Sequence, residues 1–563
     1  MNIKNVSCFF FTGIVCLLLI TACNNTPPPP DSAVVHSPEE MDTRTKRIIQ
    51  TSLEFAERNE GKIDDSIILH QPELIKHLYE KKDFITRWSR QGQWQLQADS
   101  LFDFIKNAKL YGLFPEDYHF TELTAIQARF FNDSATGLDR NDAVLWSKAD
   151  LMLTDAFGKI IKDIKLGRLP NDSITLRKDS VLTDYFYRKQ FEALDSSGSL
   201  KQTVQSLEPK HQEYHLLKAG IKKFLDSADY RSFTIVPSRG KDTAAFKKAL
   251  QHRLYEGGFI EYDSIPAESV HLAEAVKKFQ KRTGITVDGK AGEGTIRMLN
   301  LSDREKFIRI AITMDRYKML PAIMPSRYVW VNLPGYYMQL KDGDTVKIFS
   351  KIICGKPATR TPVLTSAISE MITYPQWTVP TSIIIKEILP GAKKNPDYFS
   401  RKGFSLVNAK GDEVDPYTVE WAKYSKGIPY KVVQGSGDDN ALGILKFNFN
   451  NKYAVYLHDT NQRYLFAQSA RSLSHGCVRV QEWEKLAYTI LRYDYAEGKK
   501  LSVVKDSLSS WLKRKEKHSI YVRNRLPVYI RYFTCEGNEN GIVFYDDIYD
   551  EDKILREKYF AGK

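Results

Sequence analysis

The chain has 563 residues, of which 42% are hydrophobic and 27% are charged, and its formal net charge is +13. This composition excludes a disordered or fibrous protein and indicates a globular chain of two to four domains. A positive charge of this size is typical of proteins that bind nucleic acid or an anionic surface. No basic block with interleaved aromatic residues is present, so we expect no nucleic-acid partner.

The N-terminus is typical of an export signal. Lys4 precedes the apolar run FFFTGIVCLLLI, which is too short for a membrane-spanning helix, and we assign residues 1–22 to a signal peptide. The small residues before Cys23 resemble the lipobox of bacterial lipoproteins. This resemblance implies cleavage before Cys23 and lipid on its sulfur, with a plain signal peptide as the alternative. Residues 23–40 include the run PPPP and are expected to form a flexible linker.

Helical patterns follow. Residues 41–238 contain segments such as LIKHLYEKKDF with apolar residues at helical spacing, and they predict a helical scaffold domain without a catalytic constellation. Residues 239–302 predict three short helices separated by glycine-rich turns. Their segment AVKKFQKRTGITVDGKAGEGT resembles a peptidoglycan-binding domain, and a helical spacer is the alternative. Residues 303–326 predict a helix that returns to the scaffold.

Residues 327–505 predict a mixed β-sandwich or barrel-like domain, so the fold class is multidomain α+β. The predicted strands lie in RYVWVNLPGYYMQL, DTVKIFSKIICGK, SAISEMITYPQWTVP, KYAVYLHDT and KKLSVVKD. A polar and aromatic insertion at about 381–434 is expected to be a lid or a binding loop. Residues 506–563 form a C-terminal extension with a basic helix and a hairpin.

The segment SHGCVRV at residues 474–480 combines a thiol with imidazoles. Cys477 follows His475 by two residues, and His458 lies nineteen residues upstream, near the end of a predicted strand. A thiol is a nucleophile only as the thiolate, which a nearby base or positive charge favours. An amphipathic helix is predicted next, from the spacing of its apolar residues Trp483, Leu486, Ala487, Ile490 and Leu491. Its N-terminus would lie at Cys477 and favour the thiolate.

Two other roles for Cys477 are open from local chemistry alone. A free cysteine often packs as a small hydrophobe. A metal site formed by His458, His475 and Cys477 is the least favoured, because two ligands separated by one glycine suit tetrahedral binding poorly. We therefore predict Cys477 as the nucleophile, His458 as its base and His475 as a residue that shapes the turn. No metal and no cofactor are expected.

Three of the six cysteines lie within the first 23 residues, which leaves Cys354, Cys477 and Cys535. A disulfide between Cys354 and Cys535 with a free Cys477 fits this odd count in an exported protein. Cys354 lies in an apolar run and fits equally well as a core residue. The sequence does not decide between these alternatives.

The β region resembles the L,D-transpeptidase catalytic domain, the YkuD family. The resemblance rests on YLHDT followed by SHGCVRV, and on VNLPGYYMQL, CGKPATRTP, YPQWTVPTSI and NALGILKFNF in the family's order. Together with YGLFPEDYH, DIKLGRLP and the peptidoglycan-binding-like unit, nearly the whole chain resembles the large, scaffold-bearing YcbB-like branch of this family. The insertion at about 381–434 resembles the capping subdomain of that branch.

The resemblance implies that Cys477 attacks the carbonyl before the terminal D-Ala of a tetrapeptide stem, which releases D-Ala and leaves a thioester. An amine of a second stem then forms a 3→3 cross-link. His458 would accept and donate the proton, and backbone N–H groups around Gly476 and Cys477 would hold the oxyanion. Arg479 is a candidate for binding a stem carboxylate, with a structural ion pair as the alternative. Further candidates for substrate contact are Ser474, Tyr374 and Trp377, with core packing as the alternative for the two aromatic residues.

The expected partners are peptidoglycan stem peptides, a membrane reached through the lipid on Cys23, and cell-wall synthases or a D,D-carboxypeptidase. The expected location is the periplasmic side of the cell envelope, anchored in the outer membrane. Hydrolysis of the same thioester, as in an L,D-carboxypeptidase or endopeptidase, is the first alternative function. A catalytically idle wall-binding lipoprotein is the second, and the presence of both His458 and Cys477 disfavours it.

Overall fold

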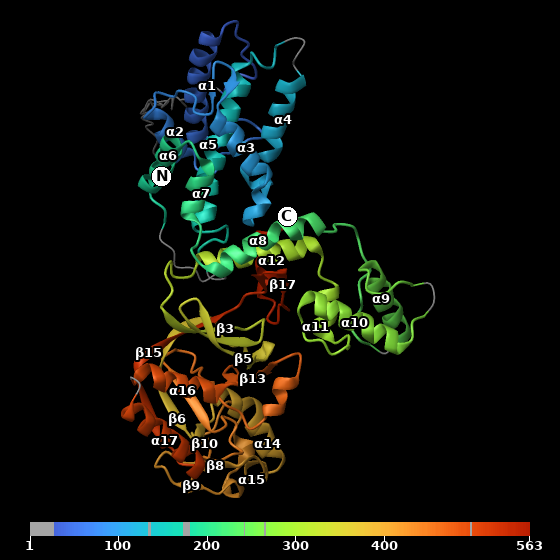
Figure 1. Ribbon diagram of the computed structural model, residues 1–563, viewed down its shortest axis with the longest axis vertical. Coiled ribbons are helices and arrows are strands. Elements are labelled where there is room, and N and C mark those ends of the chain that lie inside the picture. Colours follow the sequence, from blue (N-terminus) through green and yellow to red (C-terminus); the bar gives the residue numbers. More distant parts are fainter. Residues whose placement is uncertain (1–27, 133–136, 173–180, 241, 264–265, 496–497) are drawn as a thin grey trace, which may run out of the picture. The chain divides into compact units, whose positions relative to one another are not determined.

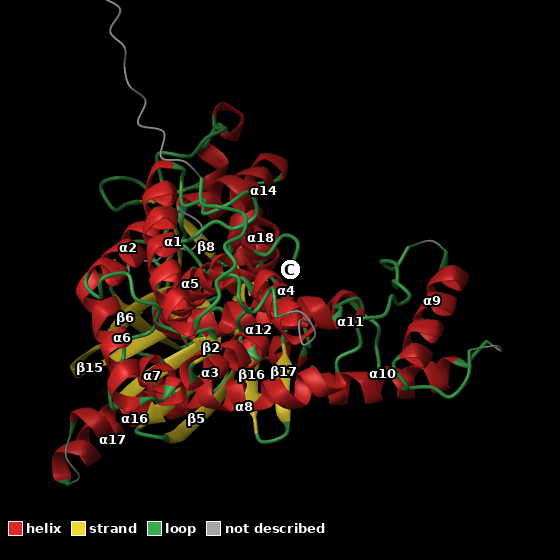
Figure 2. Cartoon of the chain, turned by 90° about the horizontal axis from the view of Figure 1, so that it is seen from above, coloured by secondary structure: helices red, strands yellow, loops and turns green. Residues whose placement is uncertain are grey.

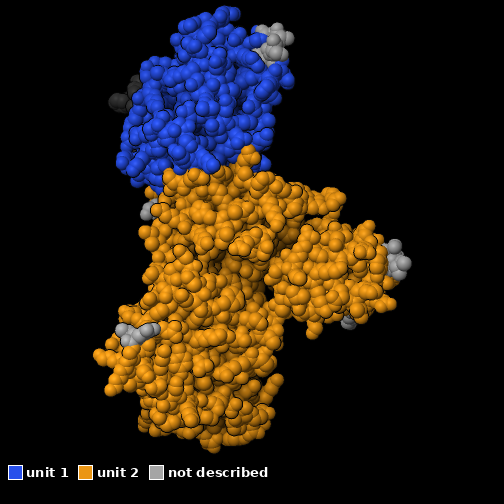
Figure 3. All heavy atoms as spheres, viewed as in Figure 1, with its two compact units in different colours: residues 1–106, 115–161, 182–203 blue, residues 107–114, 162–181, 204–563 orange. Residues whose placement is uncertain are grey.

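The computed structural model describes residues 28–132, 137–172, 181–240, 242–263, 266–495 and 498–563. The chain divides into two compact units (Figure 3): residues 1–106, 115–161 and 182–203 form the first, and residues 107–114, 162–181 and 204–563 form the second. The predicted signal peptide and the predicted lipidation site at Cys23 lie outside the described residues. Within the described ranges, none of the helices combines the length and apolar character that crossing a membrane requires.

The first unit is helical and is built around α5 (Figure 1). Its helices are α1 (Pro38–Arg58), α2 (Pro72–Glu80), α3 (Leu96–Lys106), α4 (Phe120–Asn132), α5 (Ala143–Lys165), α6 (Asp184–Ser197) and α7 (Leu200–Leu207), and β1 (Ser89–Arg90) pairs with β2 (Gln93–Trp94). Leu145, Leu151 and Phe157 lie on different sides of α5 and are all buried, because this helix is apolar around most of its circumference. Its buried Asp150 accepts hydrogen bonds from the Tyr79 hydroxyl and the Trp88 amide, so the acid is satisfied.

The second unit begins with helices that precede the sheet. They are α8 (Gln212–Ser227), α9 (Thr243–Glu256), α10 (Ser269–Thr283), α11 (Glu293–Leu299) and α12 (Asp303–Lys318). A capping box starts α12, where Ser302 Oγ accepts from the Glu305 amide and the Glu305 carboxylate accepts from the Ser302 amide. The side chain of Gln280 holds the glycine-rich turn after α10, because it bonds both Asp288 and the Gly289 amide. Helices therefore lie where the sequence predicts three short helices and the helix that follows them.

A mixed nine-stranded sheet forms the β-rich part of this unit. Its strands are β3 (Arg327–Asn332), β4 (Tyr337–Asp342), β5 (Thr345–Gly355), β6 (Leu364–Thr373), β11 (Leu445–Phe449), β12 (Leu457–His458), β13 (Ser472–Ser474), β14 (Val478–Val480) and β15 (Ser519–Arg531). The order is β13-β5-β14-β12-β11-β6-β15-β3-β4, and a further pairing of β4 with β5 closes the sheet on itself. The predicted α+β class with a barrel-like β domain is therefore confirmed.

The core of the closed sheet includes the apolar stripe of a helix. Val329, Met338 and Phe447 from the strands are fully buried, and they share one core with Leu486 and Ile490 of α16 (Trp483–Asp494). The amphipathic helix predicted after Cys477 is thus confirmed, since its spacing of apolar residues matches the face that it buries.

One prediction about the chain after α16 is wrong. The segment KKLSVVKD is the first half of helix α17 (Lys499–Arg514), not a strand; its buried Leu501 and Leu508 are seven residues apart, which is a helical spacing. Strand β15 lies between β6 and β3 inside the large sheet. The large sheet therefore includes a strand, β15, that lies beyond residue 505, the predicted end of the catalytic domain.

The insertion between β6 and β11 has a small sheet and a core of its own. It contains β7 (Trp377–Thr378), α13 (Thr381–Ile383), a π-helix (Ile384–Ile388), α14 (Leu389–Lys394), α15 (Tyr398–Lys402), β8 (Phe404–Val407), β9 (Glu413–Val414) and β10 (Lys431–Gln434), with strand order β7-β10-β8-β9. Ile388, Phe399 and Leu406 are among its buried core residues. We call residues 377–434 the cap.

The chain ends with a hairpin and a helix. Strands β16 (Cys535–Asn538) and β17 (Gly541–Phe544) pair as an antiparallel hairpin, and α18 (Glu551–Tyr559) follows. The hairpin packs beside α8 (Figure 2). The hairpin predicted in the C-terminal segment is therefore present, although it is separate from the large sheet.

Candidate active site around Cys477

The strands β12 and β14 lie side by side and parallel. Leu457 pairs with Val478, and His458 pairs with Arg479. Paired positions in neighbouring strands share a face, and consecutive residues alternate between faces. Because Leu457 and Val478 are fully buried in the core, the opposite face carries Tyr456, His458, Cys477 and Arg479. The predicted nucleophile and its predicted base are thus on one face of the sheet.

The surroundings of Cys477 both oppose and support its ionisation. Burial raises the pKa of the thiol above its ordinary value, whereas hydrogen bonding to Tyr456 and the charges of Lys446 and Arg479 oppose this rise. Its Sγ lies 3.8 Å from the carbonyl oxygen of Ala454, to which the thiol donates. The helix α16 begins only at Trp483 and β14 intervenes, so the predicted stabilisation by that helix N-terminus is wrong.

His458 is buried and neutral in this site. It is 4% exposed, and burial together with the charge of Arg479 lowers its pKa to about 3. The imidazole is therefore uncharged near neutral pH and can accept a proton. Among the hydrogen bonds between described residues, none joins His458 to Cys477; the structure brings the two residues to one face without a direct bond. Catalytic contacts of this kind often tighten only when substrate binds.

The turn before Cys477 is held by its own hydrogen bonds. Ser474 Oγ donates to the Cys477 carbonyl at 2.6 Å and accepts from the Gly476 amide at 3.1 Å. Thr361 Oγ1 donates to the Gly476 carbonyl at 2.8 Å. Gly476 has φ +123°, a conformation that favours glycine.

These bonds change two predicted roles. Ser474 is 3% exposed and its hydroxyl is engaged in the turn, so it shapes the turn and does not face substrate. The Gly476 amide is already donated to Ser474. No acceptor among the described residues takes the Cys477 amide, which leaves that N–H as the donor for an oxyanion.

His475 contacts the cap. Its Nε2 lies 2.5 Å from Oε1 of Glu387, which belongs to the π-helix of the cap. The residue predicted to shape the turn therefore also joins the turn to the cap.

The two aromatic candidates for substrate contact differ. Tyr374 is 4% exposed and its hydroxyl donates to Asp438 at 3.0 Å, so its side chain is engaged within the fold, as the packing alternative expected. Trp377 on β7 is hydrogen-bonded to Tyr456, which lies beside Cys477. Burial raises the pKa of Tyr456, the charge of Cys477 adds to the rise, and a hydrogen bond from Trp377 opposes it.

Arg479 has no anionic partner among the described residues. Its Nη1 donates to Gln462 Oε1 at 3.1 Å, and its buried Nε has no hydrogen-bond partner. Burial lowers the pKa of this guanidinium, and the charge of Cys477 opposes that effect. The structural ion pair considered from the sequence is therefore absent among the described residues, and the guanidinium is available to an anion near Cys477.

Sequence reasoning missed Tyr456 and Lys446 as members of the site. Tyr456 lies two residues before His458, and the period of a strand places both on one face. Lys446 pairs with His458 across β11 and β12. The period-two signal could have found Tyr456, whereas Lys446 becomes visible only when the strand order is known.

The other two thiols are buried and free. Cys354 and Cys535 form no disulfide, so of the two alternatives that the sequence left open for Cys354, the core residue is the one observed. Burial raises the pKa of each to about 12. Cys477 is only partly buried, so it is the most accessible of the three thiols.

Among the described residues, one group of side chains is spaced closely enough to bind a metal ion, and it lies in the first unit. His70 Nδ1 and His119 Nε2 approach the same Oδ2 of Asp155, at 2.5 and 2.7 Å. Two imidazole N–H groups hydrogen-bonded to one carboxylate oxygen account for this arrangement. The metal site considered at Cys477 does not correspond to any such group in the described residues.

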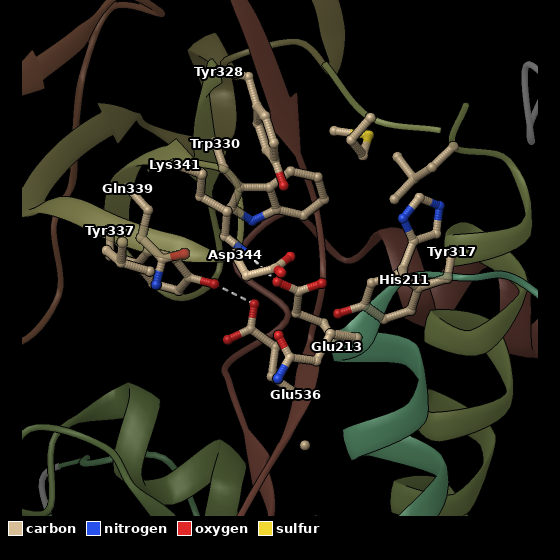
Figure 4. Close-up of a pocket in the computed structure, with 15 residues that line it drawn as sticks. His211, Glu213, Tyr317, Tyr328, Trp330, Tyr337, Gln339, Lys341, Asp344 and Glu536 are labelled. Carbon is tan, nitrogen blue, oxygen red and sulfur yellow. Dashed lines mark hydrogen bonds and ion pairs between the residues drawn. The ribbon is translucent and has the colours of Figure 1, made fainter. Parts of the chain in front are cut away.

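A separate cavity of about 230 Å³ contains none of the predicted site residues. Figure 4 shows aromatic side chains on its wall, among them Tyr317, Tyr328 and Trp330, and the Tyr337 hydroxyl bonded to Glu536. The cysteine site is therefore a different place in the second unit.

Three regions of the chain match family models. Residues 73–220 match a model described as "Scaffold domain", residues 239–299 one described as "Putative peptidoglycan binding domain", and residues 326–503 the "L,D-transpeptidase catalytic domain" of the YkuD family. These matches confirm the resemblance seen in the sequence. The third region contains Cys477 and His458, and it is an enzyme domain.

Known proteins match parts of the chain. A Haemophilus influenzae protein named "Putative L,D-transpeptidase" is 34% identical over 249 residues, which are 44% of this chain and 48% of that protein. The chain thus spans about half the length of this curated relative. Solved L,D-transpeptidases from Mycobacterium smegmatis (11% identity, 37% of this chain and 58% of that chain, TM-score 0.18) and Stackebrandtia nassauensis (16%, 54% and 97%, TM-score 0.19) are also similar. TM-scores this low do not establish a shared fold across the chain.

Proposed function

We propose that this chain forms 3→3 cross-links in peptidoglycan through an acyl group carried on Cys477. The observation that supports the proposal best is one face of β12 and β14. It holds a thiol, a neutral imidazole and a guanidinium that has no anionic partner among the residues the structure describes. All three lie inside the region that matches the L,D-transpeptidase catalytic domain.

The first half-reaction uses His458 as a proton carrier. Its imidazole accepts the Cys477 proton as Sγ attacks the carbonyl carbon before the terminal D-Ala of a tetrapeptide stem. The oxyanion receives a hydrogen bond from the Cys477 amide. When the intermediate collapses, the imidazolium of His458 donates its proton to the departing amine of D-Ala, and a thioester remains.

Arg479 supplies the binding of a substrate carboxylate. Its guanidinium is held by one neutral acceptor, Gln462, and faces the same side as Cys477. A charged donor that is largely removed from water binds a carboxylate more strongly than an exposed one. Stem peptides carry such carboxylates, including that of the leaving D-Ala.

The second half-reaction decides between transfer and hydrolysis. An amine of a second stem attacks the thioester, His458 takes its proton, and an amide forms as the thiol is restored. The cap contacts the site through Glu387 and Trp377, which favours exclusion of water and hence transfer. If water completes the reaction, the chain is instead an L,D-carboxypeptidase or an endopeptidase.

Place and partners belong to the same proposal. The sequence before Cys23 supports export and a lipid anchor on the periplasmic side of the outer membrane, and the peptidoglycan-binding domain supports contact with the wall. A reaction that removes D-Ala from longer stems, as a D,D-carboxypeptidase does, must supply tetrapeptide donors. Cell-wall synthases would supply the strands that are joined.

The proposal is tested with the full-length chain in detergent and disaccharide-tetrapeptides, with products identified by mass spectrometry. Cross-linked dimers and free D-Ala are expected, and Cys477→Ala should abolish both. Cys535→Ala, which removes a buried thiol elsewhere, is the matched control. Only tripeptides would indicate the hydrolase, and no product from a folded chain would refute both. A carbapenem, whose strained lactam mimics the acyl donor, is expected to form an adduct on the same thiol.

A further inference from the structure

Lys446 lies on the same face as the cysteine site. Leu445, Phe447 and Phe449 of β11 are buried in the core, so the period of the strand turns Lys446 to the opposite face. Lys446 pairs with His458 on the neighbouring strand. The side chain of Lys446 is only partly exposed. A lysine that is removed from water usually has a partner for its charge, so its surroundings are of interest.

The ammonium group of Lys446 lies over an aromatic ring and forms no ion pair with any acid in the described part of the chain. Its Nζ is 3.9 Å from the centroid of the Tyr456 ring. None of the described carboxylates is within ion-pair distance of it. The acid on the adjacent strand, Glu370, accepts instead from Asn448 at 2.7 Å. A cation–π contact fixes the ammonium above Tyr456 but leaves its charge uncompensated.

Two negative charges act on Lys446: that of Cys477 is the larger influence and that of Glu370 the smaller. Burial lowers the pKa of Lys446, and the charge of Cys477 is the first influence that opposes this effect. The influence is reciprocal, since Lys446 lowers the pKa of Cys477. In the free site His458 carries no positive charge near neutral pH, because its pKa is about 3. The cations available to a Cys477 thiolate are therefore Lys446 and Arg479.

We propose that Lys446 is a positioning residue of the cysteine site: its ammonium, held on the Tyr456 ring, stabilises the Cys477 thiolate and keeps Tyr456 beside it. This role rests on the proposed function only in taking Cys477 as the nucleophile. The two cations then have separate roles. Lys446 stabilises the thiolate, so Arg479 can bind a substrate carboxylate while the thiolate keeps a positive charge beside it. The titratable and charged groups around Cys477 are Lys446 on β11, Tyr456 and His458 on β12, Arg479 on β14, and the His475–Glu387 pair.

The test is the pH profile of Cys477 alkylation in the full-length chain. Iodoacetamide rates are followed by mass spectrometry of the Cys477 peptide between pH 6 and 11. Lys446→Met, which keeps the apolar stem and removes the charge, should shift the profile upward by about one pH unit. Its rate at pH 7 should therefore fall about tenfold, with the rate at the alkaline plateau unchanged. Lys446→Arg should restore most of the rate.

Lys452→Met is the matched control, because Lys452 also lies over a tyrosine ring, that of Tyr453, but is exposed. It should leave the profile unchanged. The ratio of iodoacetate to iodoacetamide rates gives a second readout, since an anionic reagent is attracted by Lys446; the ratio should fall in Lys446→Met. If Lys446→Met does not fold, Lys446→Gln replaces it.

Superimposable profiles and equal reagent ratios in the wild-type chain and the neutral Lys446 variants would overturn the proposal. Such a result would leave the proposed function intact if the wild-type chain still forms cross-links. Conversely, a wild-type chain that forms neither cross-links nor tripeptides would refute the proposed function, while thiol alkylation still reports on Lys446. The two failures are therefore distinguishable.

Discussion

His475 Nε2 lies 2.5 Å from Glu387 Oε1, so the turn that carries Cys477 is joined directly to the cap. This contact links the residue two positions before Cys477 to a π-helix nearly ninety residues earlier in the chain. The cap is therefore joined to this turn by a hydrogen bond between an imidazole and a carboxylate.

Breaking this contact should change the fate of the thioester more than its formation. In Glu387→Gln the cap is held less firmly, so water reaches the site and the ratio of tripeptide to cross-linked dimer should rise about threefold to tenfold. Product analysis by mass spectrometry measures the ratio. Glu413→Gln, at an exposed acid of the same subdomain, is the control. An unchanged ratio in Glu387→Gln would show that the contact does not govern water access.

The low pKa of His458 sets the pH dependence of acylation. Because burial lowers this pKa to about 3, the base stays neutral as the pH falls from 7.5 to 5. The acylation rate should change less than about threefold over this range, whereas a histidine with an ordinary pKa of ~6.5 would slow it more than tenfold. Single-turnover formation of the thioester, followed by intact mass, measures the profile. A steep fall centred near pH 6.5 would contradict the neutral, buried imidazole.

Arg479 should govern substrate binding through its geometry as well as its charge. Arg479→Lys keeps a cation near Cys477 but loses the two-pronged grip on a carboxylate, so kcat/KM for the tetrapeptide should fall about 10- to 100-fold. Iodoacetamide should react with Cys477 at a nearly unchanged rate. Arg401→Lys on the exposed surface of the cap serves as the control. Equal kcat/KM values for Arg479→Lys and the wild type would assign the guanidinium a structural role.

Asp155 should stabilise the first unit in a pH-dependent way. Burial alone would raise its pKa, but hydrogen bonds from His119 and His70 hold it at about 2, below the ordinary 3.8. The contribution is therefore complete above pH ~4 and is lost as the pH falls toward 2; the shift corresponds to about 2 kcal/mol.

Asp155→Asn should thus lower the free energy of unfolding of this unit by about 2 kcal/mol at pH 7 and by less at pH 3. Hydrogen exchange of α5 amides in increasing urea measures this value. Asp99→Asn, at an exposed acid of α3, should have little effect. A destabilisation by Asp155→Asn that is the same at both pH values would exclude the charge as its source.

Local periodicity predicted much of this fold and only part of its site. The apolar stripe that includes Leu486 and Ile490 predicted α16, and alternation predicted β3 and β12, because these patterns depend only on neighbours along the chain. The place of β15 in the sheet and the pairing of Lys446 with His458 depend on strand order, which no short window contains. The segment KKLSVVKD misled because its β-branched residues Val503 and Val504 are typical of strands.

The surroundings of Cys477 could likewise be predicted only in part from the neighbouring residues in the sequence. Proximity along the chain placed Cys477 at the start of a helix, but β14 lies between them, and the charges that act on the thiol come from other strands. The engagement of Ser474 within the turn also depends on hydrogen bonds that close only in three dimensions.

The central claim is that Cys477 carries the acyl group. The most direct measurement is the intact mass of the full-length chain, mixed with a disaccharide-tetrapeptide and quenched in acid, followed by peptide mapping. The account predicts an added mass equal to the donor minus D-Ala, located on Cys477, absent from Cys477→Ala and present in Cys535→Ala. An unmodified Cys477 in a folded chain that nevertheless releases D-Ala would contradict it.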